Sequence, residues 1–127
     1  MIPRLFSGID LVEISRFRGL NPLIKKRFYE RVFTEEERTA IGNSFERAAG
    51  IFAAKEALVK ALGCGIGPVS WQEVGIGYDS SGKPVAVLAG AAKTASDKLG
   101  ISEWSVSISH TQSSAVAVAV ALADPAA

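Results

Sequence analysis

The stretch "FAAKEALVKALG", residues 52–63, decides how this chain folds. It has the composition of a helix and closes on a glycine, yet it carries two lysines and a glutamate among apolar neighbours. At about 100° per residue, Lys55 falls inside the apolar arc of the helix and Glu56 falls at its edge. Lys60 follows Glu56 at the i,i+4 spacing that places two side chains together. The pattern raises the question of why a carboxylate stands at the rim of a core.

The composition of the whole chain is typical of a soluble globular protein. It has 127 residues, of which 48% are hydrophobic and 21% charged, and this predicts a single domain over residues 1–127 with a core of its own. A lone cysteine, Cys64, cannot form an internal disulfide, which is typical of a reducing compartment. The first ten residues lack the apolar segment of a signal peptide, and the apolar run 115–123 is too short to span a bilayer as a helix. We therefore expect a cytoplasmic protein without a membrane partner.

The charge is nearly balanced overall but unevenly distributed. The net charge of +1 argues against a dedicated polyanion binder. Between Arg16 and Arg31, however, there are six basic residues, including Arg27, and one acidic residue. The segment fits either a solvated helical surface or a docking patch for an acidic partner. Nucleic acid is disfavoured as that partner because the segment has little aromatic interleaving and the overall charge of the chain is near zero.

Start and stop signals divide the chain into short elements. Asn21 followed by Pro22 predicts a helix start, and Thr34 with Glu37 predicts a capping box. Ser44 can cap the long helix. The expected elements are a strand at 6–12, a short helix within 13–20, helices starting at 22, 34 and 44, a hairpin of strands 72–78 and 84–88, a helix at 90–100 and strands 103–109 and 115–122. Apart from the short helix, the order β-ααα-ββ-α-ββ predicts an α+β fold with a mainly antiparallel sheet packed with helices.

Two carboxylates lie where the pattern is otherwise apolar: Asp10 in the first strand and Glu56 at the helix rim. An ionised carboxylate is costly to bury without a cation or hydrogen-bond donors. One interpretation is two independent ion pairs, Asp10 with an arginine and Glu56 with Lys60. The alternative is that both carboxylates bind one hard cation such as Mg²⁺, with water and phosphate oxygens completing the shell.

Other polar features carry weaker signals by themselves. A lone histidine, His110, follows a strand and is compatible with a surface role or with a ligand-binding role. Glycines at 63, 65 and 67 resemble a phosphate-binding loop only weakly, because they follow a helix instead of opening one. Nothing near Cys64 indicates a nucleophile, so we expect a structural thiol. The residues alone indicate a divalent-cation site with phosphate donors nearby.

Three blocks extend this interpretation through a resemblance. The segments "GIDLVEISRF" (8–17), "FAAKEALVKALGCGIG" (52–67) and "SISHT" (107–111) resemble the signature blocks of the holo-acyl-carrier-protein synthases. These are the small bacterial class of 4′-phosphopantetheinyl transferases. The resemblance implies their fold, with active sites at the subunit interfaces of a homotrimer. It also implies their reaction: Mg²⁺-dependent transfer of phosphopantetheine from coenzyme A to a serine of apo acyl carrier protein, releasing adenosine 3′,5′-bisphosphate and supporting fatty acid biosynthesis.

The resemblance also implies roles for individual residues. Asp10 and Glu56 match the metal ligands, and Lys60 matches a lysine near the phosphates. The serine proton passes either to Glu56 or to a metal-bound water. Arg16 matches an arginine of the carrier interface, where the basic segment with Arg27 would dock. The remaining coenzyme contacts are expected from Gly63, Gly65, Pro84, Ser109, His110 and Thr111, of which Ser109–Thr111 reach a neighbouring subunit's coenzyme.

Two positions depart from relatives. Ile51 stands where several relatives have an arginine, so one phosphate or carrier contact is absent. Val12 stands where larger transferases place another carboxylate, which favours the small trimeric class and leaves that metal position to water. A non-catalytic module that docks acidic proteins or nucleic acid through its basic helices remains the alternative function. Modification of an apo carrier by coenzyme A would distinguish the two.

Overall fold

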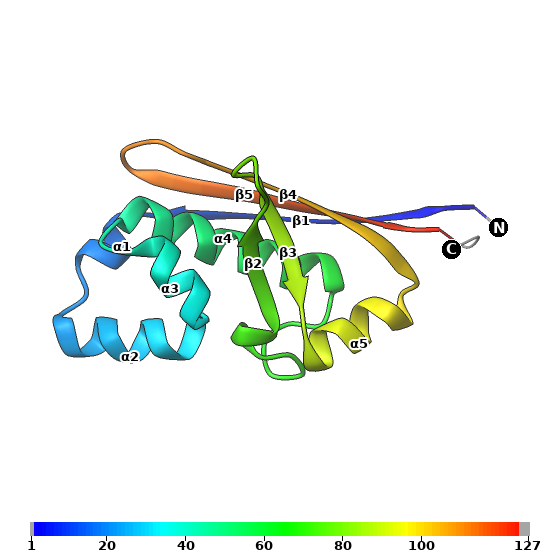
Figure 1. Ribbon diagram of the computed structural model, residues 1–127, viewed down its shortest axis with the longest axis horizontal. Coiled ribbons are helices and arrows are strands. Elements are labelled where there is room, and N and C mark those ends of the chain that lie inside the picture. Colours follow the sequence, from blue (N-terminus) through cyan, green and yellow to red (C-terminus); the bar gives the residue numbers. More distant parts are fainter. Residues whose placement is uncertain (1, 125–127) are drawn as a thin grey trace.

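The computed structural model describes residues 2–124, which form two antiparallel sheets and a layer of helices (Figure 1). The elements are β1 (Arg4–Glu13), α1 (Ser15–Arg18), α2 (Pro22–Val32), α3 (Glu35–Ile41), α4 (Phe45–Leu62), the 3₁₀ turn η1 (Trp71–Glu73), β2 (Val74–Tyr78), β3 (Pro84–Leu88), α5 (Gly90–Lys98), β4 (Ile101–His110) and β5 (Ser114–Ala123). The predicted α+β class and the antiparallel pairing are confirmed.

The larger sheet has the strand order β1-β5-β4, and β2 pairs with β3 in a separate hairpin. The central position of β5 explains why its sequence is apolar on both faces. One face carries the buried alanines of β5 against α4, and the other carries half-buried valines. Figure 1 shows α4 lying beneath this sheet, and the β2–β3 hairpin contacts α4 through β2 and the large sheet through β4.

The helix caps form as predicted. Asn21 accepts a hydrogen bond from the Ile24 N–H, and Ser44 accepts one from the Arg47 N–H. Thr34 and Glu37 make a reciprocal capping box. Gly63 ends α4 in the left-handed region at φ 74°, where a residue without a side chain is favoured.

One detail of the predicted elements was wrong. Gln72 and Glu73 belong to η1 and not to the strand β2, because Ser70 and Glu73 form a capping box that curls this segment. The short helix predicted within 13–20 is confirmed as α1, which together with α2, α3 and α4 separates β1 from β2.

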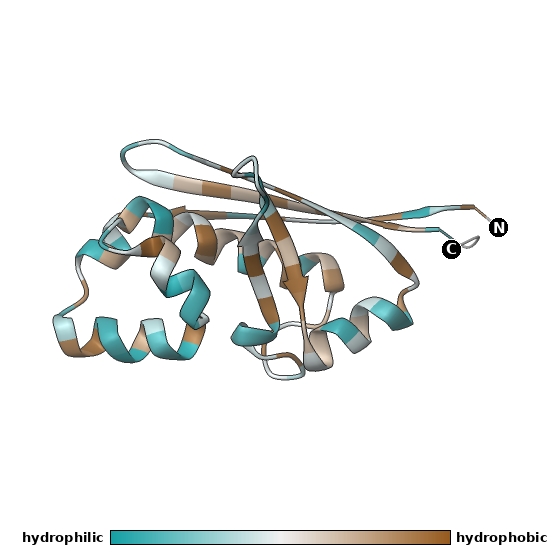
Figure 2. Ribbon diagram, viewed as in Figure 1, coloured by the Kyte–Doolittle hydropathy of each residue, from teal (hydrophilic) through white to brown (hydrophobic). Residues whose placement is uncertain are grey.

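The amphipathic pattern of α4 matches its position. Lys55 is buried, Glu56 is half-buried and Lys60 is exposed, in the order around the helix that the sequence predicts. Figure 2 shows hydrophilic colours along most of α2, whereas apolar colours dominate β2 and β3. An aromatic cluster anchors α2 to α1, α4 and η1, and it consists of Phe17, Phe28, Tyr29, Phe33, Phe52 and Trp71. Among residues 2–124, no helix is both long and apolar enough to cross a membrane.

Candidate functional site

A close approach between β1 and α4 creates the candidate site. Gly8 is buried in β1 and faces α4, where an added Cβ would collide with the carbonyl oxygen of Ala57. Only glycine therefore lets the two backbones approach this closely. Because side chains alternate along a strand, Asp10 points to the same face as Gly8 and meets the rim of α4.

Asp10, Glu56 and Lys60 form what we call the rim cluster. The Lys60 ammonium donates to Asp10 Oδ1 at 3.1 Å and to the backbone carbonyl of Ile9 at 2.9 Å. Lys60 is 53% exposed and Asp10 only 17% exposed, so the cluster opens to solvent on the lysine side. The carboxylate paired with Lys60 is thus Asp10. This result corrects the alternative in which Lys60 pairs with Glu56 and an arginine pairs with Asp10.

In the rim cluster, the negative charge of Glu56 is only partly balanced by nearby positive charge. Burial raises the pKa of Glu56 above its usual value, and the nearby Asp10 carboxylate raises the same pKa further. Lys60 and Arg16 oppose the shift without cancelling it. A carboxylate held next to a second carboxylate, with too little positive charge around both, is characteristic of a functional site. A hard divalent cation would supply the missing charge, and two carboxylates with open solvent beside them fit the coordination that Mg²⁺ prefers.

Lys55, the residue before Glu56, forms a buried ion pair whose partner was not predicted from the sequence. The Lys55 ammonium donates to Glu37 Oε1 at 2.7 Å and to Oε2 at 3.0 Å, and both side chains are fully buried. We call Glu37 and Lys55 the buried pair. A lysine inside an apolar arc signals that a carboxylate must be near. The sequence could not show which carboxylate, since Glu37 had already been assigned to a helix cap.

The other residues expected to contact the coenzyme in this part of the chain lie in the turn after α4 and in the β2–β3 hairpin. Gly63 and Gly65 are exposed directly after α4. Pro84 opens β3 after a tight turn that Asp79 stabilises by accepting hydrogen bonds from Ser81 and Lys83.

Ser109, His110 and Thr111 are exposed at the end of β4. His110 is separated from β1 by the intervening strand β5, and its charge acts on Glu46 at the start of α4. Ten residues of helix separate Glu46 from Glu56, a rise of about 15 Å. The structure therefore brings Asp10, Glu56 and Lys60 together, whereas β5 lies between His110 of the same chain and the strand that carries Asp10.

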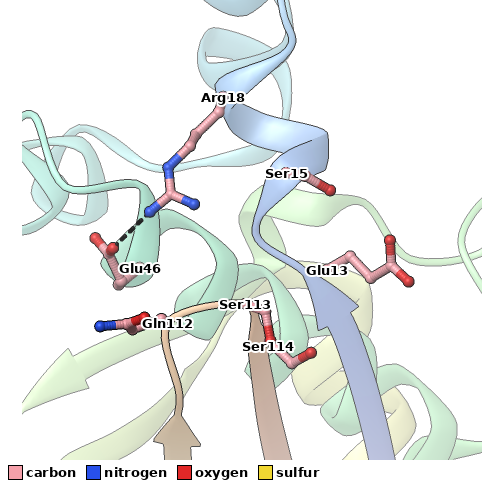
Figure 3. A pocket seen from close by; sticks show the side chains of 7 residues that line it. All are labelled: Glu13, Ser15, Arg18, Glu46, Gln112, Ser113 and Ser114. Atoms are coloured by element: carbon pink, nitrogen blue, oxygen red, sulfur yellow. Dashed lines mark hydrogen bonds and ion pairs between the residues drawn. The ribbon is translucent and has the colours of Figure 1, made fainter.

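A hollow lies at the tip of the β4–β5 hairpin (Figure 3). It has a volume of about 770 Å³. The Arg18 guanidinium donates to Glu46 Oε1 across it at 2.9 Å. Its lining residues are Glu13, Ser15, Arg18, Glu46, Gln112, Ser113 and Ser114. No sequence pattern indicated this hollow, because its residues come from three separate segments and none of these has a distinctive pattern.

The candidate docking surface lies next to the rim cluster. Arg16 stacks 5.6 Å from the centre of the Phe52 ring, and its charge acts on Glu56. It also lines an apolar hollow of about 180 Å³ with Phe17, Leu20 and Phe28. Arg27 is exposed on α2.

Comparisons with known proteins show the family to which this chain belongs. Residues 7–121 match the model of the 4′-phosphopantetheinyl transferase superfamily. The holo-[acyl-carrier-protein] synthase of Caldanaerobacter subterraneus subsp. tengcongensis is 42% identical over 123 residues, covering 93% of this chain and 94% of the relative. The corresponding enzyme of Alkaliphilus metalliredigens is 44% identical over 120 residues, covering 90% and 95%.

Solved structures show the same fold. The Helicobacter pylori holo-[acyl-carrier-protein] synthase in complex with coenzyme A superposes with a TM-score of 0.82 at 34% identity, covering 91% of this chain and 98% of that one. The Neisseria meningitidis enzyme gives a TM-score of 0.81 at 37% identity, with coverage of 91% and 96%. This chain therefore belongs to the 4′-phosphopantetheinyl transferase superfamily, among the holo-[acyl-carrier-protein] synthases.

Proposed function

We propose that this protein transfers 4′-phosphopantetheine from coenzyme A to a serine of an apo acyl carrier protein, with Mg²⁺ as cofactor. The observation that carries the proposal is the rim cluster, in which Gly8 lets β1 bring Asp10 against Glu56 and Lys60. In the reaction, the serine oxygen bonds to the phosphorus that carries pantetheine. The bond from that phosphorus to the bridging oxygen breaks, and adenosine 3′,5′-bisphosphate leaves with the electron pair. The chain's own candidate acceptor for the serine proton is Glu56.

Asp10 and Glu56 are the proposed metal ligands. Their mutual repulsion, which helps to raise the pKa of Glu56, is relieved when a cation lies between them. Bound Mg²⁺ supplies charge neutralisation and orientation for the pyrophosphate, which are the main requirements of phosphoryl transfer.

Lys60 is the proposed phosphate-binding cation. It is half-exposed and now occupied by Asp10 and the Ile9 carbonyl, so it can donate to a phosphate oxygen by a small side-chain movement. Gly63 and Gly65 follow it with no side chain to obstruct the coenzyme. Pro84, the first residue of β3, is a further proposed contact, through which the β2–β3 hairpin would also touch the coenzyme.

We propose a homotrimer in which Ser109, His110 and Thr111 serve the coenzyme bound to a neighbour. The position of His110 supports sharing, because β5 lies between its strand and the strand that carries Asp10. The outer face of the large sheet supports assembly, because it exposes an apolar surface. Leu5, Ile9 and Leu11 of β1 are 75%, 59% and 68% exposed there.

The basic surface beside the rim cluster is the proposed dock for the carrier protein. The guanidinium of Arg16 rims an apolar hollow, and Leu23 and Ile24 of α2 are 58% and 51% exposed among basic residues. An acidic partner with apolar anchors fits this combination. Reversing the charge at Arg16 and Arg27 should raise KM for the carrier far more than KM for coenzyme A, and less so at high salt.

A transfer assay tests the proposed function. The protein is incubated with Mg²⁺, coenzyme A and several apo carrier proteins, and the carriers are weighed by mass spectrometry. A mass gain of one phosphopantetheine on a carrier supports the proposal. No gain on any carrier would favour the alternative, a module that only docks acidic proteins. The holo carrier would serve fatty acid synthesis in the cytoplasm.

Sedimentation equilibrium tests the assembly separately. We expect a mass three times that of the 13.4 kDa chain. Val118→Asp, on the outer face of the sheet, should reduce that mass or unfold the protein. A stable and fully active monomer would contradict the shared site.

A further inference from the structure

The buried pair holds more than two side chains together. Besides the Lys55 ammonium, the Glu37 carboxylate accepts the Thr34 N–H at 2.9 Å and the Ile76 N–H at 2.7 Å. These donors belong to the start of α3, to α4 and to β2. One buried carboxylate thus joins three elements, and no buried side-chain nitrogen or oxygen among residues 2–124 lacks a hydrogen-bond partner.

The direction of these bonds restricts how α4 can move. Lys55 and Glu56 are consecutive, so their side chains leave the helix about 100° apart. A charge-assisted contact to both oxygens of a fixed carboxylate is directional, whereas an apolar side chain at position 55 would tolerate rotation and sliding. Fixing Lys55 therefore fixes the direction of Glu56. Lys60, one turn further along, is fixed with it.

The hydrogen bond from Ile76 to Glu37 restricts the position of the β2–β3 hairpin. Ile76 pairs with Ala86 in the β2–β3 ladder, and its N–H donates to Glu37. The same carboxylate that orients α4 therefore also sets the position of the strand pair that begins with Pro84.

We propose that Glu37 and Lys55 are positioning residues of the transferase site: they aim Glu56 and Lys60 at Asp10 and hold the β2–β3 hairpin at a set distance from them. This inference rests on the proposed function. Stability alone is a poor reason for the pair, since a buried ion pair is often no more stabilising than apolar residues of the same volume.

The test uses Lys55→Met, Lys55→Arg and a matched control. Methionine has nearly the length of lysine and no charge, while arginine keeps a charged donor for Glu37. Leu58→Ala lies on the same helix, is fully buried and leaves the pair intact. All variants are compared below their melting temperatures, with folding verified by circular dichroism. The measurements are kcat, KM for coenzyme A, KM for the carrier, and Mn²⁺ affinity with coenzyme A present, from the electron paramagnetic resonance signal of free Mn²⁺.

We expect Lys55→Met to lower kcat and Mn²⁺ affinity by about tenfold to a hundredfold, because small misplacements of reacting groups have effects of this size. KM for the carrier should stay unchanged, and Lys55→Arg should restore much of the loss. Leu58→Ala should keep wild-type kcat and Mn²⁺ affinity. If Lys55→Met does not fold, the double variant Glu37→Gln/Lys55→Met replaces it, since it leaves no unpaired buried charge, and the same losses are expected.

Two outcomes would overturn the inference. A folded Lys55→Met or double variant with wild-type kcat and Mn²⁺ affinity would show that the pair only stabilises. Equal losses in Leu58→Ala would show that any loosening of α4 has the same effect. The wild-type protein decides the proposed function independently: if it transfers no phosphopantetheine, that function fails, whereas transfer by the wild type alongside unaffected variants removes only the positioning role.

Discussion

Lys55 and Glu56 are neighbours in the chain, yet they belong to two polar regions with opposite physical properties. In the buried pair, both side chains are fully enclosed and every Glu37 oxygen accepts two hydrogen bonds. In the rim cluster, Lys60 is half-exposed and serves Asp10, while Glu56 keeps a raised pKa. A buried polar group with all its hydrogen bonds made thus stabilises the structure, whereas a carboxylate at the rim with too little positive charge around it is available for a ligand.

Breaking the buried pair should have the largest effect on stability. Glu37→Gln and Lys55→Met each leave a buried charge without its partner, which costs about 3–5 kcal/mol. The double variant should lose far less than the sum of the singles, because the two residues are in direct contact. Urea unfolding monitored by circular dichroism gives the three values, and additive losses would show that the pair does not act as a unit.

Removing His110 should have a smaller effect, confined to the coenzyme. If it binds the 3′-phosphate across a subunit boundary, His110→Ala should weaken use of coenzyme A by about ten- to a hundredfold, as expected for loss of a roughly 1.5–3 kcal/mol hydrogen bond to a charged group. Dephospho-coenzyme A, which lacks that phosphate, is the matched control and should be used equally well by both proteins. Steady-state kinetics with the two substrates decide the matter: equal losses on both would assign His110 to another contact.

The smallest effect concerns charge at the rim. Since the pKa of Glu56 is raised on folding, ionising this carboxyl destabilises the folded state, and the destabilisation grows as pH rises above the unfolded pKa. Glu56→Gln should therefore raise the melting temperature by a few degrees at pH 7, with the gain disappearing in acid.

Glu73 offers a control of opposite sign. Hydrogen bonds from the backbone N–H groups of Ser70 and Ala91 lower its pKa, so its stabilising contribution is present at neutral pH and lost in acid. Glu73→Gln should lower the melting temperature at pH 7 and have little effect in acid. Calorimetric melting temperatures of both variants across pH test whether the two substitutions have opposite effects. A Glu56→Gln variant less stable than wild type at pH 7 would contradict a raised pKa of Glu56 in the folded state.

The sequence predicted local features better than contacts between elements. The caps at Asn21, Thr34 and Ser44 depend on residues three or four positions apart, so the pattern was enough. The prediction of a strand at Gln72 was wrong because the capping box of Ser70 and Glu73 overrides the strand-like composition of this segment.

In the candidate site, too, local positions were predicted from the sequence but contacts between elements were not. The position of Glu56 at the helix rim followed from periodicity, but the partner of Lys60 did not. That partner depends on how closely β1 approaches α4 at Gly8, which is a tertiary property. For the same reason, Glu37 was predicted as a cap and not as the counter-ion of Lys55.

The most direct test of a metal ion shared by Asp10 and Glu56 is a double-mutant cycle on the rim cluster. Phosphopantetheine transfer is measured as kcat/KM for wild type, Asp10→Ala, Glu56→Gln and the double variant, with folding of each verified by circular dichroism. If Asp10 and Glu56 hold one metal ion, each single variant should lose most activity and the double variant should be little worse than either. Losses in kcat/KM that multiply in the double variant would contradict a shared ion and separate the two carboxylates.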